Sequence, residues 1–296
     1  MKEEEPPAWF TAALAAPRRE GTIAAGGCPI HFIEWGDPGD PGLLLIHGGA
    51  AHAEWWSFLA PMLADRRHAV AFDLSGHGDS GRREAYSLEA WVGEALALAE
   101  AAAFAGPPVV VGHSMGGLIA IQAARDAGER FAGVVLVDAP LRRPDPESQE
   151  GSRAWAVRSP RVYPTRAEAL ARFRLLPEQP ILHPFLVDHV AGHSVREVPG
   201  GWTWKFDPAV FRRPRHPMGE RLAQARCRLA LIHGEQSAIV PPDVAAYTAE
   251  MMGPEAPVIS IPGAHHHLLV DRPLEFVDAL SGLLDGWGHA APPGRD

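Results

Sequence analysis

The sequence predicts an α/β fold: a mostly parallel central sheet with helices on both faces and an inserted helical subdomain. Short apolar runs bounded by glycine or proline alternate with helical stretches, which is typical of parallel strands buried on both faces. The chain has 296 residues, of which 46% are hydrophobic and 21% charged, so a sizeable core is expected. About eighty residues without a buried-strand pattern interrupt the alternation, and a segment of that length should fold as a unit.

The predicted elements follow in chain order. Residues Pro6 to Arg19 form an irregular or weakly helical arm. Turn residues at 37–42 separate the second and third strands. The strands expected before the interruption are Gly21–Ala25, Ile30–Trp35, Leu43–Ile46, His68–Asp73, Val109–Val111 and Gly133–Asp138. The helices expected among them are Leu88–Ala105 and Gly116–Ala127.

The interruption runs from Leu141 to about Arg221. It holds 14 basic and 9 acidic residues, a net charge of +5 that leaves −14 for the rest of the chain. One short helix is expected within it, at Arg166–Arg174. The strands resume at Arg228–His233 and Pro257–Ile261, and an amphipathic helix follows at Pro273–Leu284. We therefore expect a core made of residues 1–140 and 222–296, with residues 141–221 as an inserted cap.

Charge and composition narrow the classes of partner. With 27 basic and 36 acidic residues the net charge is −9, which disfavours binding to nucleic acid or to an anionic membrane surface. Two cysteines are too few for a disulfide framework. The first residues are acidic, and no uncharged apolar run has the length of a membrane span. The expectation is a cytoplasmic protein, monomeric or homodimeric, that acts on a small molecule.

The strongest chemical motif is Gly112-His113-Ser114-Met115-Gly116. It lies between the apolar strand Val109–Val111 and a helix, which is the strand–turn–helix context of a nucleophile elbow. The two flanking glycines are needed because side chains there would collide where strand and helix close up. Backbone N–H groups at the start of the helix can face an anion. Ser114 is therefore predicted to be a nucleophile, whereas a helix-capping serine would not explain both glycines.

Several landmarks together resemble the α/β-hydrolase fold family. They are His47-Gly48-Gly49, the segment from Asp73 to Ser80, the elbow at 112–117 and the late His266, in the family's order and spacing. The resemblance is to the capped branch, which includes esterases, carbon–carbon bond hydrolases, epoxide hydrolases and dehalogenases. The last two need a carboxylate nucleophile, and Ser114 argues against both. The segment from Asp73 to Ser80 is interpreted as a structural turn.

The resemblance also implies an oxyanion hole and a general base. The backbone N–H after His-Gly corresponds to Gly49, with Ala50 as the near alternative, and the second donor is Met115. Of the run His265-His266-His267, the family spacing to Asp271-Arg272-Pro273 selects His266 as the base. A metal site is disfavoured, because adjacent side chains on an extended segment point in opposite directions.

The acid of the predicted triad departs from the commonest family pattern. That pattern places an aspartate where this chain has Ser237, in Gly234-Glu235-Gln236-Ser237. Some family members carry the acid one strand earlier, and Asp138 matches that position. Asp138 is the preferred candidate and Glu235 the alternative, with Asp243 weaker. Asp138 could instead be a strand-end residue with no catalytic role.

Aromatic residues suggest a largely apolar substrate. The candidate pocket residues are Trp55, Trp56, His113, Trp202 and Trp204, although core packing explains the tryptophans equally well, and a structural role explains His113. The predicted activity is a serine hydrolase acting on a carboxylic ester, thioester or lactone through an acyl-enzyme, with no cofactor and no metal. A carbon–carbon bond hydrolase, an acyltransferase and a non-catalytic small-molecule-binding protein stay as alternatives.

Overall fold

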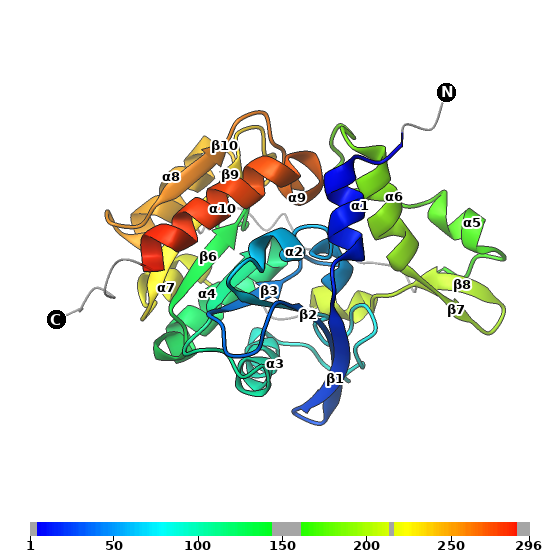
Figure 1. Cartoon of the computed structure of the whole chain (residues 1–296), viewed down its shortest axis with the longest axis horizontal. Helices are drawn as coiled ribbons and strands as arrows, with labels where there is room; N and C mark the ends of the chain where they lie inside the picture. The colour runs from blue at the N-terminus through cyan, green and yellow to red at the C-terminus, as the bar shows by residue number, and fades with distance from the viewer. Residues whose placement is uncertain (1–4, 144–160, 213–215, 289–296) are drawn as a thin grey trace.

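The computed structural model describes residues 5–143, 161–212 and 216–288. Its centre is an eight-stranded sheet in the order β1-β2-β4-β3-β5-β6-β9-β10 (Figure 1). The strands are β1 (Arg19–Ala25), β2 (Cys28–Trp35), β3 (Gly42–Ile46), β4 (His68–Phe72), β5 (Val109–His113), β6 (Gly133–Val137), β9 (Arg228–Gly234) and β10 (Val258–Ile261). The six strands β4, β3, β5, β6, β9 and β10 pair in parallel along this order, whereas β2 pairs antiparallel with both β1 and β4 at one edge. The sheet is therefore mostly parallel, as predicted.

Helices cover both faces of this sheet. One hydrophobic core packs beneath α3 (Leu88–Ala101), α4 (Met115–Ala127), α7 (Met218–Ala223) and α8 (Pro242–Met252). The other packs beneath α1 (Ala8–Ala15), α2 (Ala60–Leu63), α9 (Leu268–Asp271) and α10 (Pro273–Gly288). The central strands β3 to β6 are buried along their whole length, which explains their continuous apolar sequences.

The α-helices and the hairpin of residues 161–204 lie together at one side of the molecule (Figure 1). They comprise α5 (Arg166–Leu170), α6 (Pro184–His193) and a hairpin of β7 (Val195–Val198) and β8 (Gly201–Trp204). The hairpin was not predicted: the aromatic stretch after Gly200, expected to be turn-like, pairs as β8 beside the helices of the segment. Val195 and Thr203 are buried here, so the hairpin packs against its neighbours. Part of the predicted cap, 144–160 and 213–215, lies outside the described residues.

Other differences concern boundaries and short helices. The helix predicted to reach Ala105 ends at Ala101. The amino-terminal arm forms α1 because Phe10 packs against Phe185 of α6, with ring centroids 5.0 Å apart. Helix α7 packs on α4 and α8, two helices that cover the sheet. The predicted end of the cap at residue 221 therefore falls inside a helix that packs with the core. No helix among the described residues has both the length and the apolar character needed to cross a bilayer.

Candidate active site

Ser114 occupies a strained turn between β5 and α4. Its backbone has φ 53° and ψ −115°, a conformation that non-glycine residues seldom adopt. A Cβ on Gly112 would lie 2.4 Å from the carbonyl oxygen of Gly116, and one on Gly116 would lie 2.5 Å from that of Ile46. Both flanking glycines are thus required by close backbone approach, as the motif predicted. The turn leaves the serine side chain partly accessible at the carboxyl end of the sheet.

A chain of hydrogen bonds joins Ser114 to two further side chains. The Nε2 atom of His266 lies 3.0 Å from Ser114 Oγ, and its Nδ1 atom lies 2.6 Å from Asp138 Oδ2. The three residues are supplied by the loops that follow β5, β6 and β10. His266 is 3% exposed and Asp138 is fully buried, so the histidine–carboxylate pair is shielded from water. Sequence reasoning had proposed this trio, and the structure brings its members together.

Asp138 is held by more than the histidine. Its Oδ1 atom accepts the backbone N–H of Gly234 at 3.0 Å, and its Oδ2 atom accepts Ser237 Oγ–H at 2.6 Å. Ser237 in turn accepts the backbone N–H groups of Ile239 and Val240. The serine at the family's usual acid position therefore supports the carboxylate that comes from the neighbouring strand. This role of Ser237 was not predicted. Its signal in the sequence was that a serine stands where the family usually has the acid.

Glu235, the alternative acid, points to a different place. Its carboxylate accepts the backbone N–H of Gly263 at 2.9 Å in the turn after β10, and its side chain is exposed. The geometry thus places Asp138, and not Glu235, against the imidazole of His266.

The loop after β3 runs beside the nucleophile. A Cβ added to Gly48 would lie 3.3 Å from Ser114 Cβ, and one on Gly49 would lie 2.9 Å from a ring carbon of Phe211 and 3.7 Å from Met115 Sδ. Ala50 follows with φ 58°. Met115 is the first residue of α4, so its amide belongs to the positive end of that helix. The two predicted oxyanion donors, Gly49 and Met115, therefore lie on the two segments that flank Ser114.

Two more histidines pack around the base. The ring centroids of His113 and His267 lie 5.1 and 4.7 Å from that of His266. His113 Nε2 lies 3.0 Å from the carbonyl oxygen of His266, which fixes the loop carrying the base. Burial and the neighbouring His266 lower the pKa of His113 to about 3, so this ring is neutral at physiological pH.

The three rings also bear on metal binding. Their nitrogens lie within 4.8 Å of one another, so the expectation that adjacent histidines point apart is wrong for His266 and His267. Both nitrogens of His266 already bond to Asp138 and Ser114, and His113 bonds to a carbonyl. An ion held there would therefore compete with the serine–histidine pair.

The predicted pocket tryptophans divide into three locations. Trp55 packs beside His267, with ring centroids 5.4 Å apart, and so lies next to the base. Trp56 is fully buried against Phe276 of α10. Trp202 and Trp204 contact residues of their own segment: Arg166 lies over the Trp202 ring, and Tyr163 and Phe173 pack on Trp204. Among the described residues, Trp55 is therefore the one of these four tryptophans whose ring packs against a histidine beside the base.

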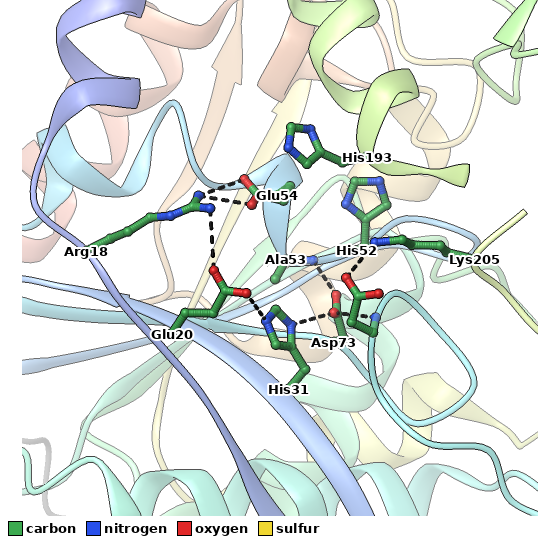
Figure 2. A pocket seen from close by; sticks show the side chains of 10 residues that line it. Arg18, Glu20, His31, His52, Ala53, Glu54, Asp73, His193 and Lys205 are labelled. Carbon is green, nitrogen blue, oxygen red and sulfur yellow. Dashed lines mark hydrogen bonds and ion pairs between the residues drawn. The ribbon is translucent and has the colours of Figure 1, made fainter. Parts of the chain in front are cut away.

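A second polar region lies around Asp73, at the turn after β4. It encloses a cavity of about 200 Å³, drawn in Figure 2. Asp73 accepts hydrogen bonds from His31 Nδ1 at 2.8 Å and from the backbone N–H groups of Ala53 and Asp79. These bonds tie the loop after β3 to the loop after β4. The structural interpretation of Asp73 agrees with this arrangement.

Known proteins resemble this chain along most of its length. The profile of the alpha/beta hydrolase family matches residues 43–279. A pimeloyl-[acyl-carrier protein] methyl ester esterase of Methylococcus capsulatus is 38% identical over 106 residues, which are 36% of this chain and 39% of that protein. The match spans only 30% of the length of an acetoin-cleaving-system acetyltransferase component of Pseudomonas putida and 41% of the length of a lipase of Mycobacterium tuberculosis. An esterase of Mycobacterium tuberculosis is 25% identical over 262 residues, 86% of each chain.

Solved structures show the same arrangement. The thioesterase domain of a curacin biosynthetic pathway superposes with a TM-score of 0.75 at 25% identity, covering 90% of this chain and 99% of that domain. The family profile covers β3 to α10, the region that supplies Ser114, Asp138 and His266. The chain therefore belongs to the alpha/beta hydrolase family.

Proposed function

We propose that this protein is a serine hydrolase that cleaves a carboxylic ester, thioester or lactone through an acyl-enzyme. The observation that carries the proposal is the hydrogen-bonded chain Ser114–His266–Asp138 on a strained elbow, with separations of 3.0 and 2.6 Å. A free serine hydroxyl is a weak nucleophile, and such a chain activates it by placing an oriented base beside the hydroxyl. The esterases among the relatives support the same class of reaction.

The first half of the reaction follows from this geometry. Ser114 Oγ attacks the carbonyl carbon while its proton passes to His266 Nε2. Asp138 holds the imidazole through Nδ1 and stabilises the imidazolium that forms. The oxygen that gains negative charge is stabilised by the backbone N–H groups of Gly49 and Met115; removing one such donor costs roughly 2.7–4 kcal/mol in other hydrolases. His266 then returns its proton to the leaving alcohol or thiol, and the acyl group stays on Ser114.

The second half regenerates the enzyme. His266 removes a proton from water, and the resulting hydroxide attacks the acyl carbon. Collapse of the second tetrahedral intermediate breaks the bond to Ser114 Oγ, which recovers its proton from His266. An acceptor other than water would make the same residues an acyltransferase, and an activated carbon–carbon bond could replace the ester. These alternatives use the same side chains and differ only in substrate.

The substrate would enter between the core and the inserted segment. We assign residues 141–221 to a cap over a core of 1–140 and 222–296. His52, which follows the oxyanion loop, lies 2.9 Å from Ser194 Oγ at the end of α6, so the loop and the cap are directly linked. Phe211 packs over Gly49 and supplies apolar surface beside the nucleophile. These contacts support a small, largely apolar substrate.

Hydrolysis of p-nitrophenyl butyrate tests the proposal. The wild-type protein should release p-nitrophenol, and Ser114→Ala should reduce kcat on the order of 10⁴-fold or more. Ser281→Ala, which changes a serine on α10, is the matched control and should keep the wild-type rate.

Labelling with a fluorophosphonate gives a second readout that does not depend on the ester chosen. The wild-type chain should gain one covalent adduct on Ser114, detectable by peptide mass spectrometry, and Ser114→Ala should gain none. Equal turnover by wild type and Ser114→Ala would overturn the mechanism. An unlabelled wild type with no turnover would favour a binding protein on the same fold.

A further inference from the structure

Three side chains beside the catalytic histidine carry buried polar atoms that lack a hydrogen-bond partner. Trp55 Nε1, Gln179 Nε2 and both ring nitrogens of His267 are shielded from solvent and unpaired among the described residues. Trp55 is 5% exposed and His267 is 7% exposed. Buried polar atoms are nearly always paired in folded proteins, so a cluster of unpaired ones next to a reactive site points to a ligand.

The three side chains come from three segments that meet at one point. Trp55 follows the oxyanion loop, His267 follows the base, and Gln179 belongs to the inserted segment. The Trp55 and His267 rings are 5.4 Å apart, and the His267 and His266 rings are 4.7 Å apart. Gln179 reaches the same place, because its Oε1 atom accepts the backbone N–H of His267 at 2.8 Å. The cluster therefore contacts the catalytic imidazole of His266 through the ring of His267.

The chemistry of the cluster is mainly that of a donor. The bond from the His267 backbone fixes the amide of Gln179, with its oxygen as acceptor, so the unpaired atom is the NH₂ group. The indole of Trp55 can only donate. Burial and the neighbouring rings of His266 and His113 lower the pKa of His267 well below its ordinary value; the Leu176 backbone faces this ring without a well-formed hydrogen bond. A neutral His267 offers one donor and one acceptor.

We propose that Trp55, Gln179 and His267 form a subsite for an uncharged hydrogen-bond acceptor, such as a ketone or amide oxygen, located a few bonds from the scissile carbonyl of the substrate. This inference rests on the proposed serine-hydrolase function and narrows its substrates to acceptor-bearing esters. Among the described residues no lysine or arginine belongs to the cluster, so a neutral oxygen fits it better than a carboxylate. A plain alkyl ester would leave the three donors unpaired, and sites built to pair polar groups discriminate against such analogues.

Two matched pairs of esters test the subsite on either side of the scissile bond. On the acyl side, p-nitrophenyl 4-oxopentanoate is compared with p-nitrophenyl pentanoate. On the alcohol side, 3-oxobutyl butanoate is compared with butyl butanoate in a pH-stat. For each pair, the kcat/KM of the keto ester is divided by that of the plain ester. This ratio is then divided by the ratio of the two rate constants for hydrolysis by hydroxide, so that the difference in intrinsic reactivity cancels. We expect the keto ester of at least one pair to be preferred about tenfold or more, equivalent to about 1.4 kcal/mol.

Substitutions that remove single donors sharpen the test. Trp55→Phe keeps a ring and deletes the N–H, and Gln179→Glu keeps the acceptor for the His267 backbone while it replaces the NH₂ group with oxygen. Each should reduce the preference for the keto ester severalfold, measured as the ratio of kcat/KM for the two esters of a pair within the same variant. Trp9→Phe, on α1, is the matched control and should preserve the preference.

The outcomes separate this inference from the proposed function. Hydrolysis of the plain esters with no keto preference in either pair would overturn the subsite and leave the hydrolase intact. A preference that survives both Trp55→Phe and Gln179→Glu would also overturn it. Failure of the wild type to hydrolyse any of the four esters, together with no fluorophosphonate adduct, would overturn the proposed function itself.

Discussion

Two of the histidine–aspartate pairs among the described residues have nearly the same geometry and opposite chemistry. His266 lies 2.6 Å from Asp138, and His31 lies 2.8 Å from Asp73. The difference is the partner of the second ring nitrogen: His266 Nε2 faces the hydroxyl of Ser114, whereas His31 Nε2 faces the carboxylate of Glu20 at 3.0 Å (Figure 2). A hydroxyl can surrender a proton to the ring, and a second carboxylate can only keep one there.

The consequence for His31 is a fixed positive charge. Burial by itself would lower its pKa, but the hydrogen bonds and charges of Asp73 and Glu20 outweigh burial and raise the pKa to about 9. A protonated ring cannot act as a base at neutral pH, so this pair crosslinks β2 to the turn after β4. A histidine–aspartate contact therefore identifies a catalytic base only when the remaining nitrogen faces a group with a transferable proton.

Within the two histidine–aspartate pairs, the largest effect is expected at the triad acid. Asp138→Asn should reduce kcat/KM for p-nitrophenyl butyrate by about 10³–10⁴-fold, because the amide no longer stabilises the imidazolium or its tautomer. Thermal unfolding should confirm that the variant folds. A variant that keeps near wild-type activity would show that the acid lies elsewhere, and Glu235→Gln would then be measured.

The support from Ser237 suggests a partial rescue. The double variant Asp138→Asn, Ser237→Asp moves the carboxylate from residue 138 to residue 237. In the wild type the Oγ atom of Ser237 lies 2.6 Å from Asp138 Oδ2. We expect about a 10–100-fold gain in kcat over Asp138→Asn alone, since the new charge is close to the imidazole. Ser237→Asp in the wild-type background is the control and should lose activity, because two carboxylates would face one another. The absence of any gain in the double variant would indicate that the geometry at Ser237 does not reach the ring.

The second pair should govern stability and not catalysis. His31→Gln should lower the free energy of unfolding by at most about 3 kcal/mol and leave kcat/KM within about twofold. The folded pKa of about 9 exceeds the unfolded value of 6.5, so this contribution is complete below pH 6.5 and is lost as the pH rises through 9. Urea unfolding at several pH values checks the sign: the gap between wild type and variant should close between pH 6.5 and 10. A gap that widens would contradict the assignment of a charged His31.

The smallest effect is expected at the rim of the polar cavity. Lys205 of the inserted segment pairs with Asp79 at 2.5 Å, and Asp79 is 54% exposed. Lys205→Met should change the free energy of unfolding by about 0.5 kcal/mol or less, because exposed ion pairs are screened by solvent. Urea unfolding at low and high salt measures this term, and a loss several times larger would show that the pair, and not packing, holds the two parts together.

How much the sequence could predict depends on how local each signal is. The buried strands and Ser114 were predictable because apolar runs and the Gly112–Gly116 spacing encode their geometry locally. Asp138 followed from family position. The support of Asp138 by Ser237 was not predictable, because it depends on β6 and β9 being neighbours in the sheet. The hairpin β7–β8 was missed for a similar reason: its short, half-buried strands carry no continuous apolar run.

The adjacency of β6 and β9 also bears on how such a site can change over evolutionary time. The carboxyl ends of these two parallel strands lie side by side: the segment after β6 supplies Asp138, which bonds to the imidazole, and the segment after β9 supplies the hydroxyl of Ser237, which bonds to Asp138. An acid after β9 in place of the one after β6 would leave the backbone and the order of serine, acid and histidine along the chain unchanged, but the two exchanges are coupled, because a chain with both carboxylates or with neither should lose activity. Neighbouring positions of this kind would let a lineage relocate a catalytic charge without a change of fold, provided that both substitutions occur together.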